Sequence, residues 1–206
     1  MKIYTLFILT FFTFIAHAQQ LDQDTINLNE TVLFDKTKFK LKRVGPDTKS
    51  KTVLVGLKAD LNMKKDSLPK IVKGFSVYIN APKKSYTVEQ LNFNFGNLLT
   101  EDVKLKIDLR KQLDSESLLE KPLFLTINQD QQDEEHVFHY NLKEQNIKGN
   151  DAFYIYVELL EESQKPVFFN AAMFSKCYYQ PENDKQWHKT PLGIAPSINA
   201  DLLIKK

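Results

Sequence analysis

Apolar and polar side chains alternate along most of this chain, and a period of two residues is the pattern of a β-strand with one buried face. In residues 103–110, VKLKIDLR, every second residue is apolar and each residue between them is charged. The same alternation recurs in the segments 53–57, 75–79, 91–95, 123–127, 138–142, 153–159 and 198–204. The sequence therefore predicts a series of short strands, each with one face toward a core.

Helical patterning is nearly absent. Residues 109–121 and 141–148 could each hold a helical turn, but segments of this length rarely form stable helices. Residues 167–179 are apolar on both faces, so we expect one long central strand there. Turn-rich links such as 45–47, 80–82, 149–151 and 180–184 separate the strands. We therefore predict an all-β fold, an antiparallel β-sandwich of the jelly-roll type with about 8–10 strands.

The first 18 residues have the three parts of a secretory signal peptide. Lys2 is the positive region, Ile3–Ile15 is an apolar stretch, and Ala16-His17-Ala18 is an A-x-A cleavage site. A helix of that apolar length spans roughly 20 Å, which is too short for a hydrocarbon core of about 30 Å. We expect residues 1–18 to be removed on export, and residues 19–206 to form a single β-sandwich domain, with 19–32 either a loose N-terminal arm or an edge strand.

Export places the mature chain in the periplasm, on the outer surface or outside the cell. No cysteine lies near the cleavage site, so we do not expect an N-terminal lipoprotein, and no later segment is apolar enough to predict a transmembrane span. The single cysteine, Cys177, excludes a disulfide framework and a zinc site built from several thiolates. Because it lies in an apolar segment, we expect Cys177 to be a small core residue rather than a nucleophile.

A formal net charge of +2 gives no reason to expect a nucleic-acid partner. The chain contains no phosphate-binding loop, no dinucleotide fingerprint, no nucleophile elbow and no calcium loop with its glycine. His136 and His139 would share one face of a helix, but the local pattern predicts a strand, which places them on opposite faces. We therefore expect no cofactor and no metal site.

Two surface segments are candidates for binding. Tyr178, Tyr179, Trp187 and His188 flank the polar loop 180–186, and aromatic rings beside amides and carboxylates are suitable for a saccharide platform. The alternative is that Trp187 packs over the end of the core.

Lysines in 36–43 alternate with Phe39 and Leu41. They could contact an anionic surface, but we favour an edge strand whose lysines prevent pairing with other chains.

The order of the segments resembles the C-terminal β-sandwich region of exported Bacteroidota proteins that carry a carboxypeptidase-like regulatory domain. The resemblance covers roughly residues 50–206. It rests on KGFSVYI (73–79), VEQLNFNFG (88–96), VKLKIDLRK (103–111), the segment 140–161, FFNAAMFSKCYYQ (168–180), Trp187, and the strand after Gly193. It implies an envelope or secreted location and a non-catalytic role, and it assigns no site residues.

The leading hypothesis is a non-catalytic exported β-sandwich with a binding or structural role in the bacterial cell envelope. Its partner would be an envelope glycan or another envelope protein. One alternative is a jelly-roll carbohydrate-active enzyme, which needs two carboxylates in one cleft. Glu158 and Asp108 are candidates, whereas Glu158 and Glu161 would point to opposite faces of a strand. A second alternative is a periplasmic carrier or chaperone that uses an exposed edge or an apolar cavity.

Overall fold

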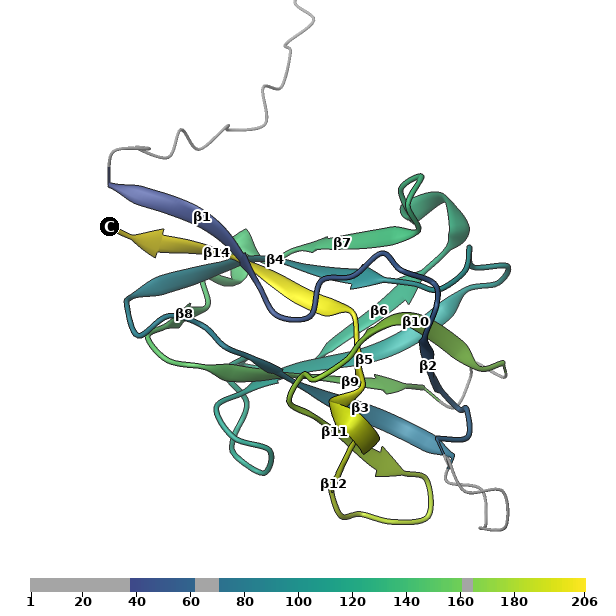
Figure 1. Ribbon diagram of the computed structural model, residues 1–206. Helices are drawn as coiled ribbons and strands as arrows, with labels where there is room; N and C mark the ends of the chain where they lie inside the picture. The colour runs from purple at the N-terminus through teal and green to yellow at the C-terminus, as the bar shows by residue number, and fades with distance from the viewer. Residues whose placement is uncertain (1–37, 62–70, 161–164) are drawn as a thin grey trace, which may run out of the picture. The chain divides into compact units, whose positions relative to one another are not determined.

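The period-two segments form antiparallel strands in the computed structural model, which describes residues 38–61, 71–160 and 165–206. All of these residues belong to the unit Asp35–Lys206. The predicted signal peptide and N-terminal arm lie outside the described residues, as does Glu161. Within the described ranges there are fourteen strands, three of them only two residues long, and the predicted all-β, antiparallel sandwich is confirmed (Figure 1).

The strands form three sheets. The five-stranded sheet has the order β1 (Phe39–Val44), β14 (Ile198–Lys205), β4 (Tyr86–Asn94), β7 (Val137–Asn141), with β8 (Lys148–Gly149) also on β4. The six-stranded sheet has the order β12 (His188–Lys189), β11 (Cys177–Pro181), β3 (Val72–Ile79), β9 (Phe153–Leu159), β5 (Val103–Arg110), β6 (Leu123–Ile127). The three-stranded sheet has the order β13 (Ala195–Pro196), β10 (Val167–Ala172), β2 (Leu54–Leu57).

Eight strands carry the jelly-roll topology: β1, β3, β4, β5, β6, β7, β9 and β14. When these eight are numbered along the chain, one sheet has the order 1-8-3-6 and the other has the order 2-7-4-5. This is the strand order of a double Greek key. Strands β10 to β13 enter between the seventh and eighth of these strands. β10 and β13 form the small third sheet with β2, and β11 and β12 add one edge of the six-stranded sheet.

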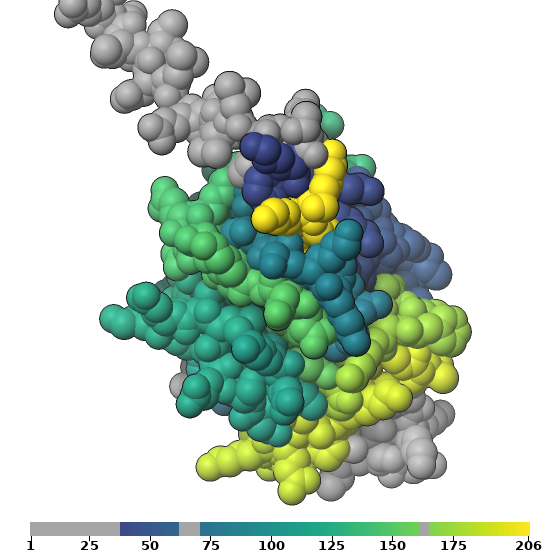
Figure 2. Space-filling model, turned by 90° about the vertical axis from the view of Figure 1, so that its left-hand side faces the viewer, coloured from purple at the N-terminus to yellow at the C-terminus, as the bar shows by residue number. Residues whose placement is uncertain are grey.

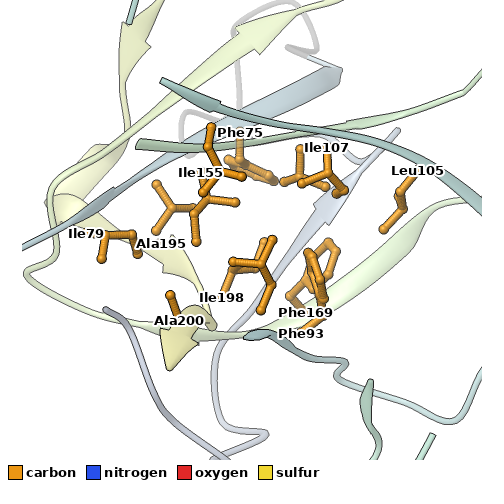
Figure 3. Close-up of a cluster of buried hydrophobic side chains, with 14 of the residues drawn as sticks. Phe75, Ile79, Phe93, Leu105, Ile107, Ile155, Phe169, Ala195, Ile198 and Ala200 are labelled. Carbon is orange, nitrogen blue, oxygen red and sulfur yellow. The ribbon is translucent and has the colours of Figure 1, made fainter. Parts of the chain in front are cut away.

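The core lies between the two larger sheets. Phe75, Ile107 and Ile155 project from the six-stranded sheet toward Phe93 and Ile198 of the five-stranded sheet (Figure 3), and all five are fully buried. Alternate residues on β5 and β9 face the other way, as the period of two predicts. Cys177 is also fully buried, and burial raises the pKa of its thiol, which is consistent with a core residue rather than a nucleophile.

The long central strand expected over 167–179 is wrong. The chain forms β10, leaves the strand at Met173–Lys176, and continues as β11 in a different sheet. Phe174 has a φ of 59°, a left-handed conformation that ends an extended segment. Apolar residues occur on both faces of this segment because β10 and β11 both pack against buried surface. The hydrophobic pattern alone does not distinguish one long strand from two short ones.

Short 3₁₀ turns are the helical elements in the described ranges: η1 (Gln129–Gln131), η2 (Lys143–Gln145) and η3 (Pro191–Gly193). The helical turn expected in 141–148 is η2, whereas 111–121 forms a loop of turns with a bridge between Arg110 and Ser117. No helix in the described residues has the length and apolar character needed to cross a membrane.

Candidate functional site

The four predicted aromatic site residues do not form one surface. Tyr178 and Tyr179 are neighbours on β11, so they point to opposite faces of the sheet. Tyr179 is buried in the core, and its ring centroid lies 5.5 Å from that of His188. Nε2 of His188 lies 2.6 Å from Oδ2 of Asp184. Tyr179 and His188 therefore belong to the core and its margin, whereas Tyr178 faces outward.

The outer face of the six-stranded sheet gathers tyrosines that the sequence analysis did not predict. Tyr78 on β3 pairs in register with Tyr154 on β9, and their ring centroids are 5.2 Å apart in an edge-to-face contact. Tyr154 makes a second edge-to-face contact with Tyr178, at 6.2 Å. Edge-to-face packing places the positive ring edge of one tyrosine against the negative face of the next. In the sequence, this cluster is indicated by tyrosines that alternate with core residues in 76–79 and 153–157.

Lys176 lies against this cluster of tyrosines. Its Nζ is 4.5 Å from the ring centroid of Tyr78 and 5.4 Å from that of Tyr154, which is within the range of a cation–π contact. A side-chain hydrogen bond to Tyr154 raises the pKa of Lys176, although partial burial opposes the rise. The Lys176 ammonium is exposed and lies over two rings.

A pocket of about 470 Å³ opens beside Lys176 and the tyrosines. We call it the tyrosine pocket, and its lining is Tyr78, Lys111, Gln112, Leu113, Asp114, Asp151, Ala152, Tyr154 and Lys176. Its volume lies within the range of small-ligand sites. The lining includes two lysines and two aspartates, so the pocket offers cationic donors and anionic acceptors in equal number without a net charge.

Trp187 lies on another part of the same outer face. Its ring meets that of Tyr156 edge to face, with centroids 5.6 Å apart. The Tyr156 hydroxyl donates to Glu158, and burial together with this carboxylate raises the pKa of Tyr156. The guanidinium of Arg110 lies over the ring of Tyr156, 5.2 Å from its centroid. Trp187 thus packs on a charged and aromatic cluster of the outer face and not over the end of the core.

Asp108 and Glu158, the carboxylates considered for catalysis, lie on this outer face as diagonal neighbours of β5 and β9. Both are engaged with neighbours. Arg110 Nε lies 2.7 Å from Asp108 Oδ2, and Ser117 donates a hydrogen bond to the same carboxylate. Lys73 Nζ lies 2.9 Å from Glu158 Oε1. Asp108 is only 2% exposed, and neither residue lines the tyrosine pocket. Both ion pairs lie within the sheet, one along β5 and one between β3 and β9, and only the hydrogen bond from Ser117 ties a loop to these carboxylates.

The two histidines considered for metal binding contact different partners. His139 lies on β7, where Nδ1 is 2.7 Å from Asn92 Oδ1 and Nε2 is 3.3 Å from Asp133 Oδ2. His136 precedes the strand with a φ of 63°, and its Nδ1 is 3.3 Å from Nζ of Lys51. Across the described ranges, no three residues of the types His, Cys, Asp and Glu gather closely enough to hold a metal ion.

The acidic loop before β7 is a turn stabilised by Asp133. Its Oδ1 accepts hydrogen bonds from the backbone N–H groups of Glu135, at 2.9 Å, and Val137, at 2.8 Å. Burial alone would raise the pKa of Asp133, but these hydrogen bonds and the nearby His139 hold it below its ordinary value. The carboxylate is therefore used to order the loop.

A polar network that the sequence analysis did not predict covers the outer face of the five-stranded sheet. Arg43 forms a two-pronged ion pair with Asp201, at 2.8 and 3.0 Å. Asn92, which is fully buried, donates to Asn199 at 2.8 Å. Asn199 in turn donates to the carbonyl of Pro46, at 3.2 Å, in the segment that crosses this face. The alternation of asparagines with apolar residues in 91–95 is the only sequence signal for it.

In comparisons with protein-family models, curated proteins and solved structures, nothing matches this chain.

Proposed function

We propose that this chain is a non-catalytic saccharide-binding module that is exported and acts in the bacterial cell envelope. The proposal rests on the tyrosine pocket. Each sugar hydroxyl both donates and accepts hydrogen bonds, so a ligand of this class needs donors and acceptors together. Lys111 and Lys176 supply donors, and Asp114 and Asp151 supply acceptors. Beside them the half-buried ring of Tyr78 can contact the apolar C–H patches of a sugar ring.

Export is supported by the residue pattern of 1–18, with its positive region, apolar stretch and A-x-A site. A non-catalytic role is supported by the ion pairs of Asp108 and Glu158. A glycosidase needs one carboxylic acid able to donate a proton and a second carboxylate free to act on the sugar or on water. In this chain basic side chains hold both carboxylates away from the tyrosine pocket.

The test is titration of the purified chain with neutral oligosaccharides of glucose, mannose, galactose and N-acetylglucosamine, followed by calorimetry and by NMR shifts of the pocket residues. Lys176→Ala removes the fixed donor, and we expect affinity for the bound oligosaccharide to fall about tenfold, the usual effect of losing one charged hydrogen bond. Lys121→Ala is the matched control, because Lys121 is exposed on the same loop as Lys111 but does not line the pocket.

Three results would contradict the proposal. The first is that none of these oligosaccharides shifts the pocket resonances. The second is that Lys176→Ala binds as the unsubstituted chain does. The third is hydrolysis of the oligosaccharide during the titration, which would show an enzyme and would return Asp108 and Glu158 to candidate catalytic residues.

A further inference from the structure

Five exposed lysines from three separate segments gather at one end of the five-stranded sheet. Lys40 and Lys42 belong to β1, Lys83 and Lys84 to the turn before β4, and Lys205 to the end of β14. Lys205 pairs in register with Phe39 on β1, and its backbone N–H donates to the carbonyl of Ser85 at 3.1 Å. Figure 2 shows these three segments meeting on one face. We call this surface the lysine end.

The lysine end is positive because acidic residues are absent from its segments. The stretches 38–44, 82–88 and 202–206 contain no aspartate and no glutamate. The adjacent Asp201 is already paired with Arg43. Among the ion pairs formed within the described ranges, none involves any of the five lysines. A chain whose net charge is only +2 therefore concentrates positive charge at one place.

Protection of an exposed edge explains only part of this surface. β1 ends the strand order of the five-stranded sheet, so Lys40 and Lys42 can prevent it from pairing with another chain. Lys83 and Lys84 lie in a turn, which has no edge to protect. Lys205 lies on β14, which pairs with β1 on one side and β4 on the other. Edge protection does not require lysines at these three positions.

We propose that the lysine end binds an anionic polysaccharide, that is, a chain that repeats carboxylate, sulfate or phosphate groups along its length. Lys40 and Lys42 point to the same side of one strand, roughly 7 Å apart, so they form a row that suits a linear ligand. Lys205 pairs with Phe39 and therefore projects from the opposite face of the sheet, and Lys83 and Lys84 lie in the adjoining turn, so positive charge lies on both faces of this end. This surface is separate from the tyrosine pocket and does not depend on the function proposed for that pocket.

An anionic membrane is a weaker candidate for the partner. Stable attachment to a lipid surface needs an apolar anchor in addition to basic residues. In the three segments of the lysine end, the only strongly exposed large apolar side chain is that of Leu41, which is 60% exposed. A single leucine adds little buried area, whereas the charges can act on a polyanion without any anchor.

The test measures binding of the full chain to dextran sulfate, with uncharged dextran as the reference, at several concentrations of NaCl. We expect binding to dextran sulfate alone, and affinity that falls steeply as salt rises, because each contact releases bound counterions. The double variant Lys83→Ala/Lys84→Ala should bind about tenfold more weakly at low salt and show a shallower salt dependence. Lys205→Ala should have a smaller effect in the same direction.

Lys121→Ala/Lys185→Ala is the control, because it removes the same two charges from exposed positions outside the lysine end. We expect it to bind as the unsubstituted chain does. The proposal is wrong if the chain does not bind dextran sulfate at low salt, or if the control weakens binding as much as Lys83→Ala/Lys84→Ala does. It is also wrong if vesicles of anionic phospholipid bind while dextran sulfate does not.

Discussion

Glu89 is a buried carboxyl at an irregularity of β4. Gln90 pairs with Asp201 and Val88 with Leu202, so Glu89 is the extra residue of a β-bulge. It is 5% exposed, and its Oε2 has no hydrogen-bond partner among the described residues. Burial raises the pKa of Glu89, although the positive charge of Lys143 opposes the rise. The charged form of Glu89 therefore costs free energy in the folded chain.

We expect Glu89→Gln to stabilise the chain at neutral pH by about 1 kcal/mol, because an amide has no charge to desolvate. A carboxyl whose pKa is higher in the folded than in the unfolded state favours folding at low pH. This contribution to stability is lost as pH rises through the folded pKa. The gain should therefore shrink as pH falls and vanish only below about pH 4, where the carboxyl becomes protonated in both states. Urea unfolding between pH 4 and 8 measures it.

Glu182→Gln is the control for this experiment, because Glu182 is exposed. Its unfolding free energy should follow that of the unsubstituted chain at every pH. A Glu89→Gln chain whose stability difference does not change with pH would show that burial of the charge is not the cause.

The end of β1 depends on a glycine. Gly45 has a φ of +108°, which side chains other than hydrogen rarely allow, and a Cβ there would lie 2.6 Å from Cδ1 of Ile79. From Gly45 the chain crosses the outer face of the five-stranded sheet, where the carbonyl of Pro46 accepts a hydrogen bond from Asn199. This turn therefore fixes both the end of a strand and the polar cover of a sheet.

Gly45→Ala should lower the free energy of unfolding by about 2 kcal/mol, the sum of backbone strain and the contact with Ile79. Gly96→Ala is the matched comparison. A Cβ at Gly96 would meet the tip of the Leu54 side chain at 2.7 Å, but the backbone there is not left-handed and a leucine tip can rotate away. We expect Gly96→Ala to cost less. Equal losses in urea titrations of the two variants would contradict a role for the Gly45 backbone.

In one segment, the hydrophobic pattern of the sequence did not distinguish one strand from two. Residues 167–179 contain a single apolar run, but β10 pairs with β2 and β13, whereas β11 pairs with β3 and β12. The break occurs at Phe174, which is 87% exposed. Because nothing local marks a phenylalanine as a turn residue, the hydrophobic pattern alone predicted one strand where two exist.

At the scale of the whole molecule, the last strand completes the sheet that the first strand begins. β14 lies between β1 and β4, and seven of its eight residues are buried. The five-stranded sheet therefore depends on contacts between the two ends of the described chain, which close long loops.

A chain that ends at Ser197 should fail to fold at 25 °C, because β1 and β4 would lose their shared partner and the core would lose one wall. Near-ultraviolet circular dichroism and thermal unfolding measure this outcome. A chain that ends at Ile204 is the comparison, since it lacks only the exposed Lys205 and Lys206. It should unfold within a few degrees of the full chain. A cooperative transition in the shorter chain would show that β14 is dispensable.

The sequence by itself determined the fold class and many of the core residues. A period of two forces one face of each strand inward, so Leu105, Ile107 and Ile155 were assigned to the core from spacing alone, and Cys177 from its apolar surroundings. The predicted platform included both Tyr178 and Tyr179, although neighbours on one strand point to opposite faces of the sheet.

Only the tertiary structure decided which outward side chains meet. Tyr78, Tyr154 and Lys176 come from segments far apart in the chain, and strand pairing brings them to one pocket. Lys40, Lys83 and Lys205 gather for the same reason. A local pattern records which face of its own strand a residue occupies, but the neighbour on that face is set by register between distant strands. The surfaces proposed for binding are therefore properties of the topology.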